Sequence, residues 1–251
     1  MDCDQRIALT KSKVNRLVDV TLRLLRLRAS NEILVYSDLI AAQVPTSYAA
    51  HTFNEVQSVM FDHELIRLCT LWDSANSESR AIDRDSIPAV IWLVDHTEVI
   101  EFLVDETRQA HAARGARVFN MPDDPDEQGI IEGMLAQHQQ DFAEEQAKKA
   151  RQWLTEAMDS ARQVQSGPVL RSVVDYRDRT AHLLAADVSR RNPDRIAQFG
   201  DEKRLLDITV EIVDKLHLAV NGASFAWDMS REFAERTAKA FWNGVKINVV
   251  E

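Results

Sequence analysis

Apolar residues recur at intervals of three and four along most of this chain, and that spacing is typical of amphipathic α-helices. The first such stretch covers residues 6–31 and carries Ile7, Val14, Leu17, Val18, Leu22, Leu25 and Leu27. Comparable spacing predicts further helices over about 47–73, 86–118, 126–165, 169–188, 202–220 and 225–245. We therefore expect an all-α protein built as an antiparallel helical bundle.

Breaks in this pattern fall where proline, glycine or short polar residues gather: near Pro45, at 73–77, at 120–125, at Gly167-Pro168, near Pro193 and Gly200, and at Asn221-Gly222. Ser86 stands two residues before Pro88, which predicts a helix N-cap at Ser86. We expect one domain over 1–222, including a long helical insertion at about 120–166. A C-terminal helix within 223–251 is expected to pack on it. Because its apolar stripe is thin, the insertion helix is expected to form half of a helical hairpin or to contact a partner subunit.

The composition narrows the class of protein further. Glycine and proline number 7 and 6, about 5 % of the 251 residues against an average of about 12 %, which is too few for a β-sandwich or barrel. The longest apolar run, Ala89–Val94, is far shorter than the roughly 18 residues that cross a bilayer. Cys3 and Cys69 form no C-x-x-C pair, so reduced thiols are expected. Since the N-terminus carries no secretion signal, we expect a cytoplasmic protein without membrane contact.

The net charge of −10 argues against a protein that coats nucleic acid nonspecifically. One stretch is nevertheless basic: 6–28 holds seven arginines and lysines and a single acid, Asp19. Two interpretations remain open for it. The basic side chains pair with acids elsewhere in the fold, or they contact a nucleic-acid backbone.

Most signatures of catalysis are missing. The chain has no G-x-G-x-x-G, no phosphate-binding loop and no G-x-S-x-G elbow. Its seven histidines never occur three or four residues apart, so no helix face offers a histidine pair to a metal. We expect neither a metal nor another cofactor.

One segment, Arg177-Asp178-Arg179-Thr180-Ala181-His182, combines unusual features. Arg177 falls inside the apolar stripe of its predicted helix, which consists of Leu170, Val173, Val174, Ala181 and Leu184. A guanidinium stays charged and resists full burial, so Arg177 must find an anion, a partner surface or an open cleft. Asp178 stands four residues before His182, where it can orient the imidazole and raise its pKa.

This combination suits the cleavage of RNA without a metal. The imidazole of His182 can move a proton to or from the ribose 2′-hydroxyl or the leaving 5′-oxygen, while Arg177 stabilises the charge on phosphorus. The two residues lie about 140° apart around an ideal helix. A site that uses both therefore needs a bent helix, a reaching arginine, or a second copy across a dimer axis.

The pattern Arg177-Asp178-x-x-x-His182 resembles the Arg-Asn/Asp/His-x-x-x-His signature of HEPN domains, which are small antiparallel α-helical bundles. Three other stretches resemble the U-type abortive infection subgroup: 61–73 with Arg67 and Leu71-Trp72-Asp73, the helix start Ser86-Ile87-Pro88, and 176–182. The similarity in element order spans about 6–218.

The resemblance implies a metal-independent endoribonuclease used in phage defence or as a toxin. It further implies a homodimer whose subunits share a cleft, RNA as substrate, an antitoxin as partner, and Arg177, His182 and Asp178 as catalytic residues. Two alternatives stand beside this interpretation. The fold is a binding module for RNA, a nucleotide or a protein, or it is a structural dimerisation bundle in which Arg177 pairs with an acid of a neighbouring helix.

Overall fold

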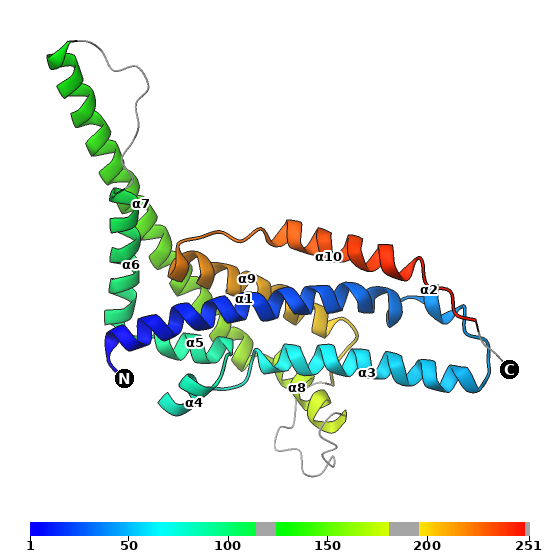
Figure 1. Ribbon diagram of the computed structural model, residues 1–251. Helices are drawn as coiled ribbons and strands as arrows, with labels where there is room; N and C mark the ends of the chain where they lie inside the picture. Colours follow the sequence, from blue (N-terminus) through cyan, green and yellow to red (C-terminus); the bar gives the residue numbers. More distant parts are fainter. Residues whose placement is uncertain (114–123, 181–195, 249–251) are drawn as a thin grey trace.

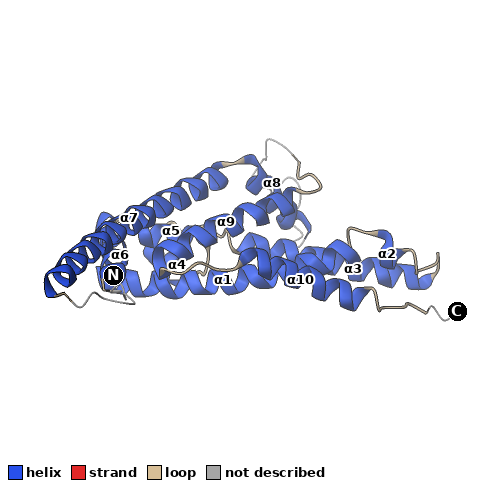
Figure 2. Ribbon diagram, turned by 90° about the horizontal axis from the view of Figure 1, so that it is seen from above, coloured by secondary structure: helices blue, strands red, loops and turns tan. Residues whose placement is uncertain are grey.

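A computed structural model of the protein describes residues 1–113, 124–180 and 196–248, and these residues form ten helices and no strand (Figures 1 and 2). The expected all-α class is confirmed. The helices are α1 Cys3–Leu34, α2 Asp38–Ala41, α3 Tyr48–Thr70, α4 Glu78–Asp83, α5 Ile87–Val94, α6 Thr97–Ala112, α7 Pro125–Ser166, α8 Pro168–Thr180, α9 Asp201–Asn221 and α10 Trp227–Trp242.

The long helix α1 lies at the centre of the bundle, between α3, α9 and α10 (Figure 1). Asp2 caps its N-terminus: the Asp2 carboxylate accepts a hydrogen bond from the backbone N–H of Gln5, while the Gln5 side chain accepts one from the N–H of Asp2. Chain direction in Figure 1 shows α3 and α9 antiparallel to α1. The main core gathers apolar residues from α1, α3, α5, α6, α7, α8 and α9, so these helices share one core.

The helix predicted over 86–118 is wrong as a single element, because the chain breaks at Asp95 and His96 into α5 and α6. Asp95 adopts φ −75° and ψ 51°, and His96 is extended. Helix α5 is apolar on nearly every side and is buried in the core, whereas α6 is amphipathic and lies along α7. One straight helix cannot both enter the core and lie along α7, so the chain turns between α5 and α6. The predicted part beyond 113 lies outside the described residues.

Helix α7 forms a hairpin with α6 and continues beyond it, away from the bundle (Figure 1). The hairpin interpretation is therefore confirmed. Its inner half packs on α9 and buries small residues such as Ala150 and Ala157, whereas Ile130 and Met134 near the outer end are exposed. Across the described residues, no helix combines the length and the apolar content that a bilayer crossing requires.

Helix α10 lies along α1 and closes a second, smaller apolar cluster at the far end of the bundle. Ala234 and Ala238 bring α10 close to Ala29 and Ile33 of α1. The chain after α10 returns to α2, where the N–H of Ile247 donates to the Gln43 side chain at 3.1 Å.

The basic stretch 6–28 is largely neutralised within the fold, which supports the first of its two interpretations. On α1, Lys11 pairs with Glu106 at 2.6 Å, and Arg16 pairs with Asp85 at 3.0 Å. Arg6 packs 4.8 Å over the ring of Trp92. Further ion pairs hold Lys13 and Arg28.

Ser86 caps α5 as the sequence predicts, and it also holds the preceding loop. Its Oγ accepts from the N–H of Ala89 at 3.3 Å and donates to the carbonyl of Asp73 at 2.8 Å, in a fully buried position. Ser86→Ala is therefore expected to lower the free energy of unfolding by about 1–2 kcal/mol, measured by urea denaturation. Ser77→Ala removes the exposed cap of α4 and serves as the matched control with a smaller loss. Equal losses in the two variants would contradict this role.

Candidate functional site

The segment that carries Arg177 is the C-terminal half of α8, which packs against α3, α7 and α9. Leu170, Val173 and Val174 are buried as the predicted stripe requires. Arg177 continues that stripe with only 13 % of its side chain exposed. The prediction that this guanidinium lies on the packed side of its helix is therefore confirmed. Ala181 and Leu184, the rest of the stripe, lie outside the described residues.

Arg177 contacts two carboxylates. Its Nε and Nη2 donate to Oδ1 of Asp178 at 2.9 and 2.5 Å, and its Nη1 lies 3.9 Å from Oδ1 of Asp73. Asp178, which the sequence analysis placed beside His182, thus contacts Arg177 directly. His182 lies outside the described residues. Arg179 is exposed and pairs with Asp175 at 3.0 Å.

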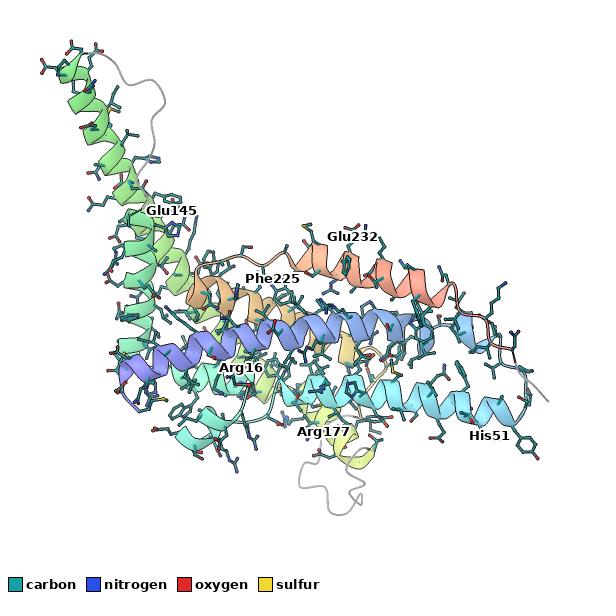
Figure 3. All side chains as sticks on the ribbon, in the orientation of Figure 1. Arg16, His51, Glu145, Arg177, Phe225 and Glu232 are labelled. Carbon is teal, nitrogen blue, oxygen red and sulfur yellow. The ribbon has the colours of Figure 1, made fainter. Side chains whose placement is uncertain are left out.

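A cavity of about 430 Å³ opens beside Arg177. Its size is that of a small-ligand site. Four arginines line it, and they come from two separate segments of the chain. The lining consists of Cys69, Trp72, Asp73, Ser74, Arg80, Arg84, Gln165, Leu170, Arg171, Val174 and Arg177. Figure 3 labels Arg177 on α8, on the opposite side of α1 from Glu232 of α10.

The loop after α3 carries Asp73 to this cavity, and the core holds it in place. Trp72 is buried and donates its indole N–H to Oγ1 of Thr209 on α9 at 2.9 Å. The carbonyl of Leu71 accepts from the N–H of Ile87 at 2.8 Å, next to the Ser86 contact with Asp73. Two stretches that the sequence analysis singled out, Leu71-Trp72-Asp73 and Ser86-Ile87-Pro88, are therefore joined in space. Together they fix one wall of the cavity.

A buried lysine of α1 fixes the wall that bears α4. Lys13 is 1 % exposed, and its Nζ donates to the carbonyls of Ile82 and Arg84 at 2.9 and 2.7 Å and to the Asp85 carboxylate at 3.0 Å. The backbone of Arg84 is thus held at the cavity. Three acceptors around one ammonium satisfy all of its donors, which is what permits its burial.

Positive charge dominates the cavity. Among its lining residues in the described part of the chain, Asp73 is the one carboxylate, and it faces two guanidiniums. Its Oδ1 lies 3.9 Å from Arg177, and its Oδ2 lies 3.9 Å from Nη1 of Arg84. Both separations are longer than a charge-assisted hydrogen bond, so neither guanidinium is saturated by Asp73. The cavity therefore attracts anions on a chain whose net charge is −10.

No motif or periodicity in the sequence indicates Arg80, Arg84 or Arg171 as site residues. Arg80 lies in α4, a short helix that the sequence did not indicate, and Arg84 is the extended residue directly after it. Nothing local in the sequence indicates that Arg80 and Arg84 lie at the same cavity as α8 residues. No group of three or more histidine, cysteine or carboxylate side chains suited to a metal forms among residues 1–113, 124–180 and 196–248.

A second cluster of charges is buried away from this cavity. Arg28 of α1 donates to Glu64 of α3 at 3.2 Å and to Glu202 of α9 at 3.0 Å, and Asn31 donates to Glu64 at 2.6 Å. The Arg28 guanidinium also lies 4.2 Å over the ring of Tyr36. Burial raises the pKa of Glu64, although Asn31 and Arg28 act in the opposite direction. The cluster joins α1, α3 and α9, and none of its residues lines the Arg177 cavity.

Comparison with protein families identifies the fold. The sequence model of the HEPN_AbiU2 family, described as AbiU2, matches residues 10–241, which is most of the chain. The chain belongs to this HEPN family. The match covers Arg177, Asp178 and His182 together with both segments that bring arginines to the cavity, so the resemblance inferred from the motif is confirmed as a HEPN domain of abortive infection type. No curated protein and no solved structure matches the chain.

Proposed function

We propose that this HEPN domain is a metal-independent endoribonuclease whose active site is centred on Arg177. The observation that carries the proposal is the position of Arg177: the arginine of the HEPN motif stands, nearly buried, in the wall of an arginine-lined cavity. A structural arginine of this kind would be expected to pair closely with an acid of a neighbouring helix. Here the contact from another element, Asp73, stays at 3.9 Å.

Each motif residue has a defined role in the proposed reaction. The ribose 2′-hydroxyl attacks the adjacent phosphorus and loses its proton, the bond from phosphorus to the 5′-oxygen breaks, and that oxygen gains a proton. His182 serves one of these two proton transfers as general base or general acid. Arg177 donates to the phosphoryl oxygens, whose charge grows as phosphorus becomes five-coordinate. Asp178 holds the Arg177 guanidinium by the observed pair of hydrogen bonds and orients His182.

Incubating the purified protein with total RNA in EDTA tests the proposal. We expect cleavage that survives the chelator and leaves a 2′,3′-cyclic phosphate on one product and a 5′-hydroxyl on the other, because the nucleophile belongs to the substrate. Expression in a bacterial host is expected to inhibit growth, and Arg177→Ala or His182→Ala should relieve the inhibition. Cleavage that is lost in EDTA and restored by a divalent cation would contradict the proposal.

We further propose that the active unit is a homodimer in which residues of two chains meet. The roughly 140° between Arg177 and His182 on an ideal helix favours sites composed across subunits. Mixing Arg177→Ala and His182→Ala proteins is then expected to restore cleavage to about a quarter to a half of the wild-type rate, since mixed dimers hold one intact site. Sedimentation should give the mass of a dimer. A monomer with full activity would rule this arrangement out.

One observation favours a second candidate, a HEPN-fold module that binds RNA, a nucleotide or a protein without cleaving RNA. The arginine-lined cavity is complete among the described residues and needs no proton donor to bind an anion. This alternative predicts salt-sensitive binding of RNA without turnover. The EDTA experiment separates the two candidates, because only the nuclease produces fragments.

A further inference from the structure

The cavity holds more guanidiniums than one scissile phosphate requires. Arg80 and Arg84 reach it from the α4 segment, and Arg171 reaches it from the first turn of α8. Arg80 is exposed, and within the described part of the chain no hydrogen bond or ion pair holds its guanidinium. Keeping like charges together costs energy unless an anion offsets their repulsion. The arrangement thus calls for a second anionic group.

We propose that Arg80, Arg84 and Arg171 form a second phosphate subsite, which holds the backbone of single-stranded RNA beside the phosphate at Arg177. This inference rests on the nuclease function proposed above, because it assigns the rest of the same cavity to the same substrate. It also assigns a function to α4, the element that no sequence motif indicated.

Arg171 and Arg177 stand at different positions along α8, and this distance separates the proposed subsite from the phosphate that reacts. Arg171 and Arg177 are six residues apart, roughly 9 Å along a helix axis at 1.5 Å per residue, and both line the cavity. Two guanidiniums whose backbones are this far apart can each hold a separate phosphate of one strand. A chain that occupies both positions must present successive phosphates along the cavity.

Several features favour RNA backbone as the occupant. A guanidinium presents a planar fork of donors that matches phosphate oxygens, and all four basic groups here are arginines rather than lysines. Asp73 lies 3.9 Å from Arg84 and from Arg177, Arg84 also donates from Nη1 to the carbonyl of Ser74 at 3.1 Å, and Arg177 donates to Asp178, which leaves other donors of both guanidiniums available. A concave site suits a single strand, whose backbone bends into it, better than a stiff duplex.

Binding to an RNA that cannot be cleaved tests the subsite separately from catalysis. A fluorescently labelled single-stranded RNA with 2′-O-methyl riboses lacks the nucleophile, so anisotropy reports binding alone. We expect the Arg80→Gln/Arg171→Gln double variant to bind it roughly ten-fold more weakly than wild type. The slope of log affinity against log salt should fall by about 0.7 for each phosphate that the variant no longer neutralises.

Two further variants control the measurement. Arg80→Gln alone removes an exposed side chain whose guanidinium has no hydrogen bond or ion pair with residues 1–113, 124–180 or 196–248, so weaker binding by this variant would not reflect a disturbed fold. Arg236→Gln removes the same charge from the exposed face of α10 and should leave the affinity and the slope as in wild type. Circular dichroism should give all variants the helical content of wild type.

The outcomes separate the subsite from the proposed function. Suppose that wild type cleaves unmodified RNA but the double variant binds the 2′-O-methyl RNA with unchanged affinity and salt dependence. The proposed subsite is then wrong, whereas the proposed nuclease function is not contradicted. If the double variant binds as weakly as expected while wild type never cleaves RNA, the subsite stands and the nuclease is wrong. Equally weakened binding in the double variant and in Arg236→Gln would also overturn the subsite, because it would show a general effect of charge.

Discussion

Arg177→Ala is expected to lower the rate of RNA cleavage by a factor of about 10²–10³, the usual effect of removing one preorganised donor from a developing oxyanion. The structure supplies the reason, because Asp178 and Asp73 hold this guanidinium in the cavity wall before any substrate arrives. Single-turnover cleavage of a defined labelled RNA measures the effect. Arg177→Lys keeps the charge but loses the planar fork and should retain an intermediate rate.

Arg236→Ala is the matched control, since it removes an exposed arginine on the other side of α1 and should leave the rate unchanged. The free energy of unfolding of Arg177→Ala should fall only modestly, because Asp178 and Asp73 remain 20 % and 40 % exposed and can be hydrated. A rate for Arg177→Ala equal to that of Arg236→Ala would contradict the assignment.

Arg28→Ala is expected to destabilise the fold by about 3–5 kcal/mol, the cost of leaving buried charges without their partner. Glu64 is 1 % exposed and the Glu202 side chain 8 %, so neither carboxylate can turn to solvent once the guanidinium is gone. Urea denaturation measures the loss. Arg26→Ala, which removes an exposed arginine two residues earlier on α1, should change stability little.

The pH dependence of Arg28→Ala gives a second check. Burial raises the pKa of Glu64, and removing Arg28 removes an influence that lowers it. A carboxyl whose folded-state pKa is raised above its unfolded value stabilises the fold when protonated, and this contribution is lost as the pH rises through the folded pKa. The loss in free energy of unfolding that Arg28→Ala causes should therefore become smaller as the pH falls below neutrality towards that pKa. A loss in free energy of unfolding that becomes larger at lower pH would contradict the role of Glu64.

The periodicity of apolar residues predicted the long helices well, because each buries one face over many turns. It failed at Asp95 and His96, where two helical patterns of different kinds follow each other without glycine or proline. It also missed α4, whose six residues are too few to display a period. Breaks of this kind are set by packing, since α5 enters the core and α6 follows α7.

The candidate site was predictable in part. Arg177 is a charged residue at a position where the pattern of its helix expects an apolar one, and this mismatch can be recognised from the sequence alone. Arg80, Arg84 and Lys13 show no conflict in sequence, because charged residues in a short helix or a basic stretch are ordinary. Their contribution to the site depends on contacts between segments that are far apart in the sequence, such as the hydrogen bond from Lys13 to the carbonyl of Arg84, about seventy residues away. Only the three-dimensional structure brings Arg80 and Arg84 to the cavity and Lys13 to the backbone of Arg84.

The most direct test of the central claim is the structure of the protein bound to a 2′-O-methyl RNA. The account predicts a phosphate oxygen within about 3 Å of the Arg177 guanidinium, inside the cavity between α4 and α8. RNA bound on another face, such as the one formed by α1 and α10, with the Arg177 cavity left without a phosphate, would contradict it.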